Sequence, residues 1–332
     1  MKKTVGLREV AQRAGVSLGT ASKIVNNTGN VNDKMRKKVL QAVKDLNYVP
    51  NVFARSLKTN LTFTIGVIIP EISNSFFDEV VGGIQDFFEP EGYSVLIYNT
   101  RLNSKKEIEA FDMFNQKVDG IIFVSNTIND ELFEVLKNIS IPIVLVSTYA
   151  QGFVSININN EQAAFSAVDL LCKQGHTKIA LLSGDPEDLN AGYPRLKGYM
   201  RALSENNIQI RTEFIRYGKY RFEDGVRNTL ELLAQKDRPD AIFAASDTMA
   251  VGALHVLQAG GHKIPTDISI IGFDDIAIAR YASPALSTVR QPRYKMGSEG
   301  ARKLSLLMRQ EEIEIKNYIF DFELVIRAST KL

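Results

Sequence analysis

The chain has 332 residues, of which 45% are hydrophobic and 23% charged, a composition typical of folded globular proteins. Its length allows two or three domains. No apolar run reaches the length of a membrane span, and no apolar segment of a signal peptide follows the basic start, so we expect a cytoplasmic protein. The single cysteine, Cys172, lies in the apolar stretch AVDLLCKQG and is expected to be buried and unreactive.

The net charge of +2 conceals an uneven distribution. Residues 1–60 contain twelve lysines and arginines but three acidic residues, a net charge of +9. The rest of the chain contains 28 basic and 35 acidic residues, a net charge of −7. A basic head on an acidic body is typical of a protein in which only the head meets a polyanion, although a solvated basic surface would give the same charge.

The basic head reads as three short helices. Apolar residues at helical spacing in LREVAQRAG predict a first helix that ends at Gly15. Ser17 is placed to cap a second helix, LGTASKIVNN, and Asn32 a third, DKMRKKVLQAVKDLN. The third helix has one apolar face, which comprises Met35, Val39, Ala42, Val43 and Leu46. The following VFARSLKTN is too short to bury a core of its own.

From Phe63 onward, apolar runs rich in isoleucine and valine alternate with amphipathic stretches. The runs are FTIGVIIP, YSVLIYNT, VDGIIFVS, IPIVLVST, KIALLSG, DAIFAAS and SIIGFDD. The amphipathic stretches include 76–89, 104–117, 161–174, 193–206 and 247–259. This alternation predicts an α/β body of two doubly wound, parallel-sheet subdomains, whose ligands bind beyond the carboxyl ends of the strands.

The stretch GVSLG, residues 15–19, also fits the G-x-S-x-G nucleophile elbow of hydrolases. An elbow needs a strand before its serine, whereas a predicted helix precedes Ser17. The three histidines, His176, His255 and His262, all lie far away in the sequence. Asp274 and Asp275 could be read as a carboxylate pair, but neighbouring residues on a strand point to opposite faces. With no phosphate-binding loop and no zinc spacing either, we expect no enzyme, no metal site and no cofactor.

Two short helices joined by a tight turn at Gly15, within a basic segment, match a helix-turn-helix. At these residues the chain resembles the LacI/GalR (lactose-repressor) family of transcription regulators. The resemblance is dense in REVAQRAGVSLGTASKIVNN, VLQAVKDLNYVPN and ARSLKT. It continues through NSFFDEVVGGIQ, GHTKIALLSG, RLKGYMRAL, ASDTMAVGAL, IPTDISIIGFDD, LSTVRQP and LVIRAST, so it covers the whole chain.

The resemblance implies a body of the periplasmic sugar-binding type, in which the chain crosses three times between subdomains. It places the DNA-binding head at 1–50 and a hinge helix and linker at 51–61. The effector-binding N-subdomain is then 62–160 with 292–321, and the C-subdomain is 161–291 with 322–332. Members of the family are homodimers, sometimes tetramers, and a two-fold dimer pairs with a near-palindromic operator in double-stranded DNA.

The family's DNA-contacting positions fall on two segments. In the head they are Ser17, Leu18, Gly19, Thr20, Ser22, Lys23 and Asn26, and in the hinge they are Ala54, Leu57 and Lys58. Leu18, Gly19 and Lys23 match base-reading positions, although Leu18 could instead be a packing residue. Gly19 has no side chain with which to read a base, and Lys23 replaces the usual arginine, a better bidentate reader of guanine. Leu57 matches a leucine wedged into the minor groove, with an apolar anchor as the alternative.

The effector positions are also carried over from the resemblance. Phe76 and Phe77 match an aromatic wall, and polar candidates are Asn159, Arg195, Tyr220, Asp247, Asp274 and Gln291. Asn159 stands where many relatives have aspartate, and Asp247 could instead cap the helix that follows it. Leu189 replaces an arginine of the purine-binding branch, which argues against a purine effector.

The family implies a repressor whose operator affinity is controlled by a sugar or sugar phosphate. Two alternatives stay open: a catabolite-control regulator whose co-repressor is a phosphorylated carrier protein, and a sugar-binding protein without DNA function. The basic head counts against the second alternative. The sequence identifies neither the effector, the operator nor the sign of regulation.

Overall fold

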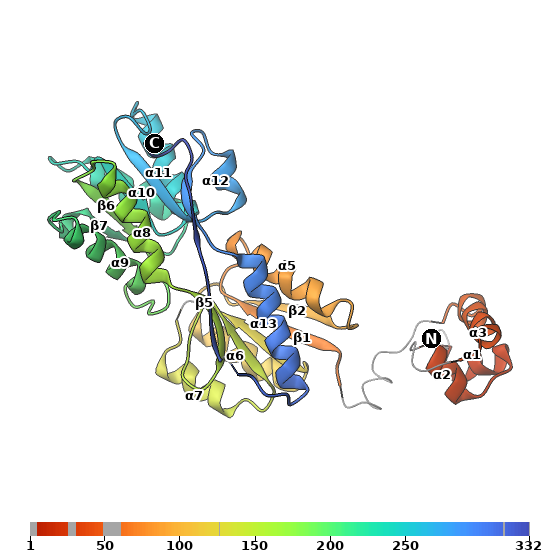
Figure 1. Cartoon of the computed structure of the whole chain (residues 1–332). Coiled ribbons are helices and arrows are strands. Elements are labelled where there is room, and N and C mark those ends of the chain that lie inside the picture. Colours follow the sequence, from red (N-terminus) through yellow and green to blue (C-terminus); the bar gives the residue numbers. More distant parts are fainter. Residues whose placement is uncertain (1–4, 26–30, 49–60, 126, 315, 332) are drawn as a thin grey trace. The chain divides into compact units, whose positions relative to one another are not determined.

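The computed structural model describes residues 5–25, 31–48, 61–125, 127–314 and 316–331. The chain divides into two compact units, Met1–Thr62 and Phe63–Leu332, which we call the head and the body (Figure 1). Within the described residues, no helix combines the length and the apolar character needed to cross a bilayer.

The head contains α1 (Leu7–Ala14), α2 (Leu18–Val25) and α3 (Asp33–Asp45). Gly15 ends α1 in the left-handed conformation at φ 65°, as its sequence position predicts. The three helices enclose a small apolar core made of Val10, Ala11, Ala14, Ala21, Ile24, Val39 and Ala42. On the apolar face of α3, Val39 and Ala42 are buried, whereas Met35 in the first turn is 46% exposed.

The first sheet of the body, sheet A, is entirely parallel, with strand order β11-β5-β4-β3-β1-β2. Its strands are β1 (Thr64–Ile69), β2 (Ser94–Asn99), β3 (Gly120–Val124), β4 (Ile143–Val146), β5 (Val154–Ile158) and β11 (Asn317–Phe320). The helices of this subdomain are α5 (Phe76–Phe88), α6 (Ser104–Phe114), α7 (Asp130–Asn138) and α13 (Arg293–Met308). Apolar side chains cover both faces of the sheet, as a parallel sheet requires.

The second sheet, sheet B, has the order β12-β10-β9-β8-β6-β7. It is parallel except for the edge strand β12, which pairs antiparallel with β10. Its strands are β6 (Ile179–Ser183), β7 (Ile215–Tyr217), β8 (Ala241–Ala244), β9 (Ser269–Asp274), β10 (Ser287–Arg290) and β12 (Glu323–Val325). Its helices are α8 (Asn160–Lys173), α9 (Gly192–Glu205), α10 (Phe222–Leu233), α11 (Asp247–Ala259) and α12 (Ala277–Tyr281), with a short 3₁₀ turn at Thr212–Phe214.

The chain passes between the two sheets three times. It leaves sheet A after β5, returns from β10 through α13 to β11, and crosses back to β12 (Figure 1). All seven apolar runs named in the sequence form strands, and all five amphipathic stretches form helices. The fold class is therefore confirmed.

Cys172 is partly rather than fully buried: it packs against the hydrophobic core of the body, while the next residue, Lys173, is exposed. Burial is still the main reason that the pKa of its thiol rises to about 11. The thiolate, which is the reactive form, is therefore disfavoured at neutral pH.

Helices α5 and α13, from distant parts of the sequence, pack side by side against sheet A (Figure 1). Their backbones touch at two glycines. A Cβ on Gly83 would overlap the carbonyl oxygen of Tyr294, and a Cβ on Gly297 would overlap that of Val80. This contact holds α13 where its first turn reaches the space between the two sheets.

We expect Gly83→Ala to lower the free energy of unfolding of the body by about 1–3 kcal/mol, because the added methyl group meets rigid backbone. Gly82→Ala is the matched control, since a Cβ at Gly82 meets nothing within 4 Å. Alanine should stabilise the helix there by about 0.5–1 kcal/mol. Urea unfolding of both variants measures the difference, and equal effects would contradict the close approach of the helices.

Candidate functional site

In the head, α2 presents a polar outer face while Ala21 and Ile24 face the core. Leu18, which is 44% exposed, lies on the outer face together with exposed Gly19 and Lys23. Thr20 and Ser22 are half-buried beside them. Five positions that match DNA contacts therefore lie on one short helix. Asn26, Ala54, Leu57 and Lys58 lie outside the described residues.

Ser17 caps α2. Its Oγ accepts a hydrogen bond from the backbone N–H of Thr20 at 3.1 Å and lies 2.9 Å from the Thr20 hydroxyl. The segment before Ser17 is helix α1 rather than a strand. The geometry is that of a helix cap and not of a nucleophile elbow.

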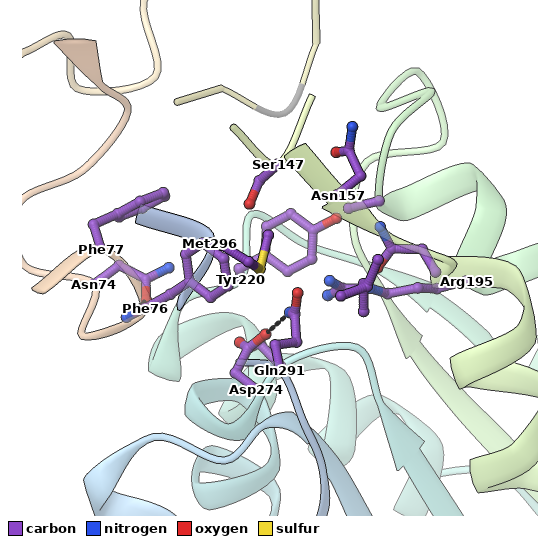
Figure 2. A pocket seen from close by; sticks show the side chains of 14 residues that line it. Asn74, Phe76, Phe77, Ser147, Asn157, Arg195, Tyr220, Asp274, Gln291 and Met296 are labelled. Atoms are coloured by element: carbon purple, nitrogen blue, oxygen red, sulfur yellow. Dashed lines mark hydrogen bonds between the residues drawn. The ribbon is translucent and has the colours of Figure 1, made fainter. Parts of the chain in front are cut away.

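In the body, a cavity lies between the carboxyl ends of the two sheets (Figure 2). Six of the eight predicted effector residues line it: Phe76, Phe77, Arg195, Tyr220, Asp274 and Gln291. They come from α5, α9, the loop before α10, the end of β9 and the segment before α13. We call it the effector cavity.

Arg195 is the main cation of the cavity and is only 6% exposed. Its Nε donates to Asn160 Oδ1 at 2.9 Å, and its Nη1 donates to the carbonyl oxygen of Ala245 at 2.6 Å. The guanidinium carbon stands 3.7 Å from the centre of the Phe273 ring. These contacts fix the arginine fork from three sides, so its remaining N–H groups are held in position for a ligand.

Asp274 is the main acid of the cavity. Burial raises the pKa of its carboxyl to about 6, although Arg195 and Arg293 nearby and a hydrogen bond from Gln291 Nε2 at 2.7 Å oppose that rise. Burial acts against the charge of Asp275 as well, but hydrogen bonds from Arg290 and Arg327 outweigh it and lower the Asp275 pKa. The adjacent carboxyls therefore have separate partners and do not form an acid–base pair.

The aromatic wall has two parts. Phe76 and Phe77 pack edge to face with ring centres 5.2 Å apart. Tyr220 lies opposite (Figure 2) and donates its hydroxyl to Asp188 Oδ2 at 2.8 Å. A site that combines flat rings with a carboxylate and an arginine fork suits a sugar, which has apolar CH faces and a belt of hydroxyl groups.

Two predicted residues lie outside the cavity, each one position away from a residue that lines it. Asn159 is exposed and caps α8 by accepting the N–H of Gln162 at 3.0 Å, whereas Asn160 faces the cavity. Asp247 is fully buried and accepts hydrogen bonds from Thr288 Oγ1 at 2.6 Å and from the N–H of Ile276 at 2.9 Å.

Ser246, the residue before Asp247, has both roles that the sequence suggested for Asp247, namely lining the cavity and capping the helix. Ser246 lines the cavity and is also the N-cap of α11, accepting the N–H of Met249 at 3.2 Å. Successive residues at a helix start point in directions about 100° apart, so a one-residue error changes the direction of the side chain.

The sequence pattern did not single out the remaining lining residues. These are Asn74, Ser147, Asn157, Ile158, Asn160, Ala191, Ser246 and Met296. Most of them follow a strand or begin a helix, which is the signal that could have found them.

The free space in the effector cavity is about 40 Å³, enough for a few water molecules. A sugar would fit only if the two subdomains separated or if side chains moved. Among the described residues, no group of three histidine, cysteine or acidic side chains is arranged to hold a metal ion.

Two family models match the chain. Residues 6–51 match that of the bacterial regulatory proteins of the lacI family, and residues 168–330 match that of the periplasmic binding protein-like domain. Catabolite control protein A of Priestia megaterium is 37% identical over 330 residues, which are 98% of this chain and 99% of that protein.

Two solved structures show the same architecture. The lac repressor dimer bound to operator and the anti-inducer ONPF is 28% identical with a TM-score of 0.88, and the match covers 99% of each chain. The complex of the regulator CelR with cellobiose is 29% identical with a TM-score of 0.74, over 98% of this chain and 99% of that one.

A basic helix-turn-helix head joined to a two-subdomain body with a cavity between its sheets defines a DNA-binding regulator with an effector-binding domain. The chain belongs to the LacI family of bacterial transcription regulators. Repressors of this family bind operator DNA and small-molecule effectors and act as dimers.

The cap of α2 gives a direct test. Ser17→Ala should destabilise α2 by about 1 kcal/mol, whereas Ser17→Gly should cost only a few tenths of that. Hydrogen exchange of the α2 amides in the full chain measures the loss, and we expect exchange about fivefold faster in Ser17→Ala. Unchanged exchange at the Thr20 amide would show that the hydroxyl does not cap the helix.

Proposed function

We propose that the protein is a dimeric repressor that binds a near-palindromic operator and whose DNA affinity is controlled by a small carbohydrate or sugar phosphate. The supporting observation is the effector cavity, in which six side chains assigned to effector binding come together from both subdomains. The subdomains would be 62–160 with 292–321 and 161–291 with 322–332. Because its operator is chromosomal DNA, we place the protein in the cytoplasm.

In the DNA complex, the outer face of α2 would lie in the major groove. Leu18 and Lys23 would contact base edges, while Thr20, Ser22 and Asn26 would contact phosphates or the groove wall. The backbone at Gly19 can approach the bases closely because it has no side chain. In the hinge segment, Ala54 and Leu57 would face the minor groove, where a leucine wedge unstacks a base step, and Lys58 would contact the backbone.

In the effector complex, the ring of a sugar would stack against the aromatic wall. Arg195, Asp274 and Gln291 would hydrogen-bond its hydroxyl groups, each group being oriented by other protein contacts. Because Arg195 belongs to one subdomain and Phe76 to the other, a ligand that contacts both changes the equilibrium between open and closed forms of the body.

Polar contacts between the two subdomains favour the closed form. Arg221 Nη2 lies 3.0 Å from Glu71 Oε2 of the other subdomain. Buried Arg293, from α13, donates to the carbonyl oxygen of Asp275 of the other subdomain at 2.8 Å, and an ion pair with Glu79 of its own subdomain orients it. An effector shifts the equilibrium only by the difference in its affinity for the two forms.

A catabolite-control regulator with a phosphorylated carrier protein as co-repressor is the second candidate. The similarity to a catabolite control protein A and the small effector cavity favour it. A protein co-repressor needs no space inside the body. A thermal-shift screen with glucose, cellobiose, glucose 6-phosphate and fructose 6-phosphate separates the two candidates, since a ligand at a hundredfold its Kd adds about 2.7 kcal/mol of stability.

Operator binding should depend strongly on salt, because each phosphate that is neutralised releases counterions. Lys23→Ala should weaken operator binding by about 1–3 kcal/mol and relax the base preference at one position. Lys236→Ala, which removes the same charge from the body, is the control and should change little. Titrations on operator and random DNA measure both, and equal binding of the two DNAs by the wild type would overturn the proposed function.

Arg195→Ala and Asp274→Asn should each weaken effector binding by about 1–3 kcal/mol, because each leaves a ligand group unpaired in a desolvated site. Operator affinity without effector should stay nearly unchanged. Because the Asp274 pKa is about 6, effector affinity of the wild type should fall as the pH drops through 6 and the accepting carboxylate is lost.

Calorimetry with the ligand found in the screen measures these affinities, with Asn159→Ala as a control outside the cavity. If the Arg195 and Asp274 variants bind the ligand as tightly as the wild type, the effector binds elsewhere.

A further inference from the structure

A second space lies between the two subdomains, and we call it the side chamber. Its walls are the start of α6 and the segment after β3 on one side, and the loops after β6 and β7 on the other. The free space is about 220 Å³, several times that of the effector cavity and enough for a small organic molecule.

Tyr220 separates the side chamber from the effector cavity, since its side chain lines both. Its ring packs directly on the backbone of Gly184, where a Cβ would overlap the phenol. Its hydroxyl is held by Asp188. A ligand in one of these spaces therefore touches a wall of the other.

Two buried carboxyls face the side chamber. Glu107 of α6 is 7% exposed, and Asp188 of the loop after β6 is 2% exposed. Glu107 Oε1 accepts a hydrogen bond from Ser125 Oγ at 3.2 Å, but that hydroxyl also lies 3.3 Å from the carbonyl oxygen of Thr127. Glu107 Oε2 accepts no hydrogen bond from the described residues, and because Glu107 lines the chamber this oxygen is open to a ligand there.

Neither carboxyl has a cationic partner in the described part of the chain. Burial raises the pKa of Glu107 to about 7 and also raises that of Asp188, and the groups that oppose these rises are hydroxyl and backbone donors. Lys219 lines the chamber but forms an ion pair with neither carboxyl among these residues. Lys219 is therefore the positive charge of the lining, but it leaves the two desolvated acids unpaired.

The chemistry of the walls narrows the ligand class. Asp185 also lines the chamber, so three acids would repel a phosphate or carboxylate. The described acidic side chains are not clustered closely enough to hold a metal ion, which argues against a divalent cation. An organic ammonium group needs only one well-placed carboxylate. The hydroxyl groups of Ser104 and Thr127 line the chamber for a polyol, and so does the amide NH₂ of Asn129, whose Oδ1 caps α7.

We propose that the side chamber binds a small polyhydroxylated amine, of the amino-sugar class, whose ammonium group pairs with Glu107. Such a ligand touches both subdomains and so stabilises the closed body. The site does not depend on the proposed function, because ligand binding to the body can be measured without DNA.

The test is calorimetry on the full chain at pH 7 with two matched pairs, glucosamine against glucose and galactosamine against galactose. Each pair differs only by an amine in place of one hydroxyl. A charge-assisted hydrogen bond to a buried carboxylate should make the amine bind about tenfold more tightly than its neutral partner in at least one pair.

Glu107→Gln keeps the size of the side chain and a partner for Ser125 but cannot carry a charge, so it should abolish the preference for the amine. Glu109→Gln removes an exposed carboxyl from the same helix and should leave the preference unchanged. Asp274→Asn tests separately whether the amine binds in the effector cavity. Glu107→Gln should melt no lower than the wild type at pH 8, because it removes a buried charge, and this confirms that the variant is folded.

Equal affinity for the amine and the neutral sugar in both pairs overturns the proposal. The proposal is also overturned if neither amine binds. A preference that survives Glu107→Gln also overturns it. A preference lost in Asp274→Asn places the ligand in the effector cavity instead. Operator titrations are independent of all these results, so a failure here is distinguishable from a failure of the proposed function.

Discussion

The constraint on which the body depends is that two parallel sheets present their carboxyl ends to the same space. A parallel sheet must be covered by helices on both faces, so its polar side chains can collect only at the strand ends. Because the chain crosses between the sheets three times, these ends are held opposite each other without a separate interface. The effector cavity and the side chamber both follow from this arrangement.

The buried carboxyls around that space differ in how far neighbouring groups offset the cost of their burial. Asp275 is surrounded by arginines and keeps a low pKa, so it supports the joint between β9, β10 and β12. Asp274 is only partly compensated and keeps a raised pKa in the effector cavity. Glu107 has one hydroxyl donor and no cation among the described residues. Of these three acids, the two that line a space for a ligand, Asp274 and Glu107, are the ones with a raised pKa.

The contacts between subdomains explain how such a site can act on DNA. The described ion pairs and hydrogen bonds across the space are few, and several lie at its exposed mouth, where each contributes little. Because these contacts are weak, a ligand that binds one form more tightly easily shifts the equilibrium between the open and closed body. A large apolar interface between the subdomains would hold the body in one form. The glycine contact between α5 and α13 fixes these two helices of the sheet A subdomain to each other, so a shift of one moves the other with it.

The sequence by itself determined the fold class, seven strands and five helices of the body, because apolar periodicity is a local pattern. The six predicted residues that line the effector cavity came from the family resemblance. The sequence also determined the caps at Gly15, Ser17 and Asn32. Only the tertiary structure decided between Asn159 and Asn160 and between Asp247 and Ser246, since one residue at a helix start changes the side-chain direction by about 100°. Likewise, the side chamber joins α6 to loops more than 70 residues away, and no local pattern records which distant carboxyls are buried together.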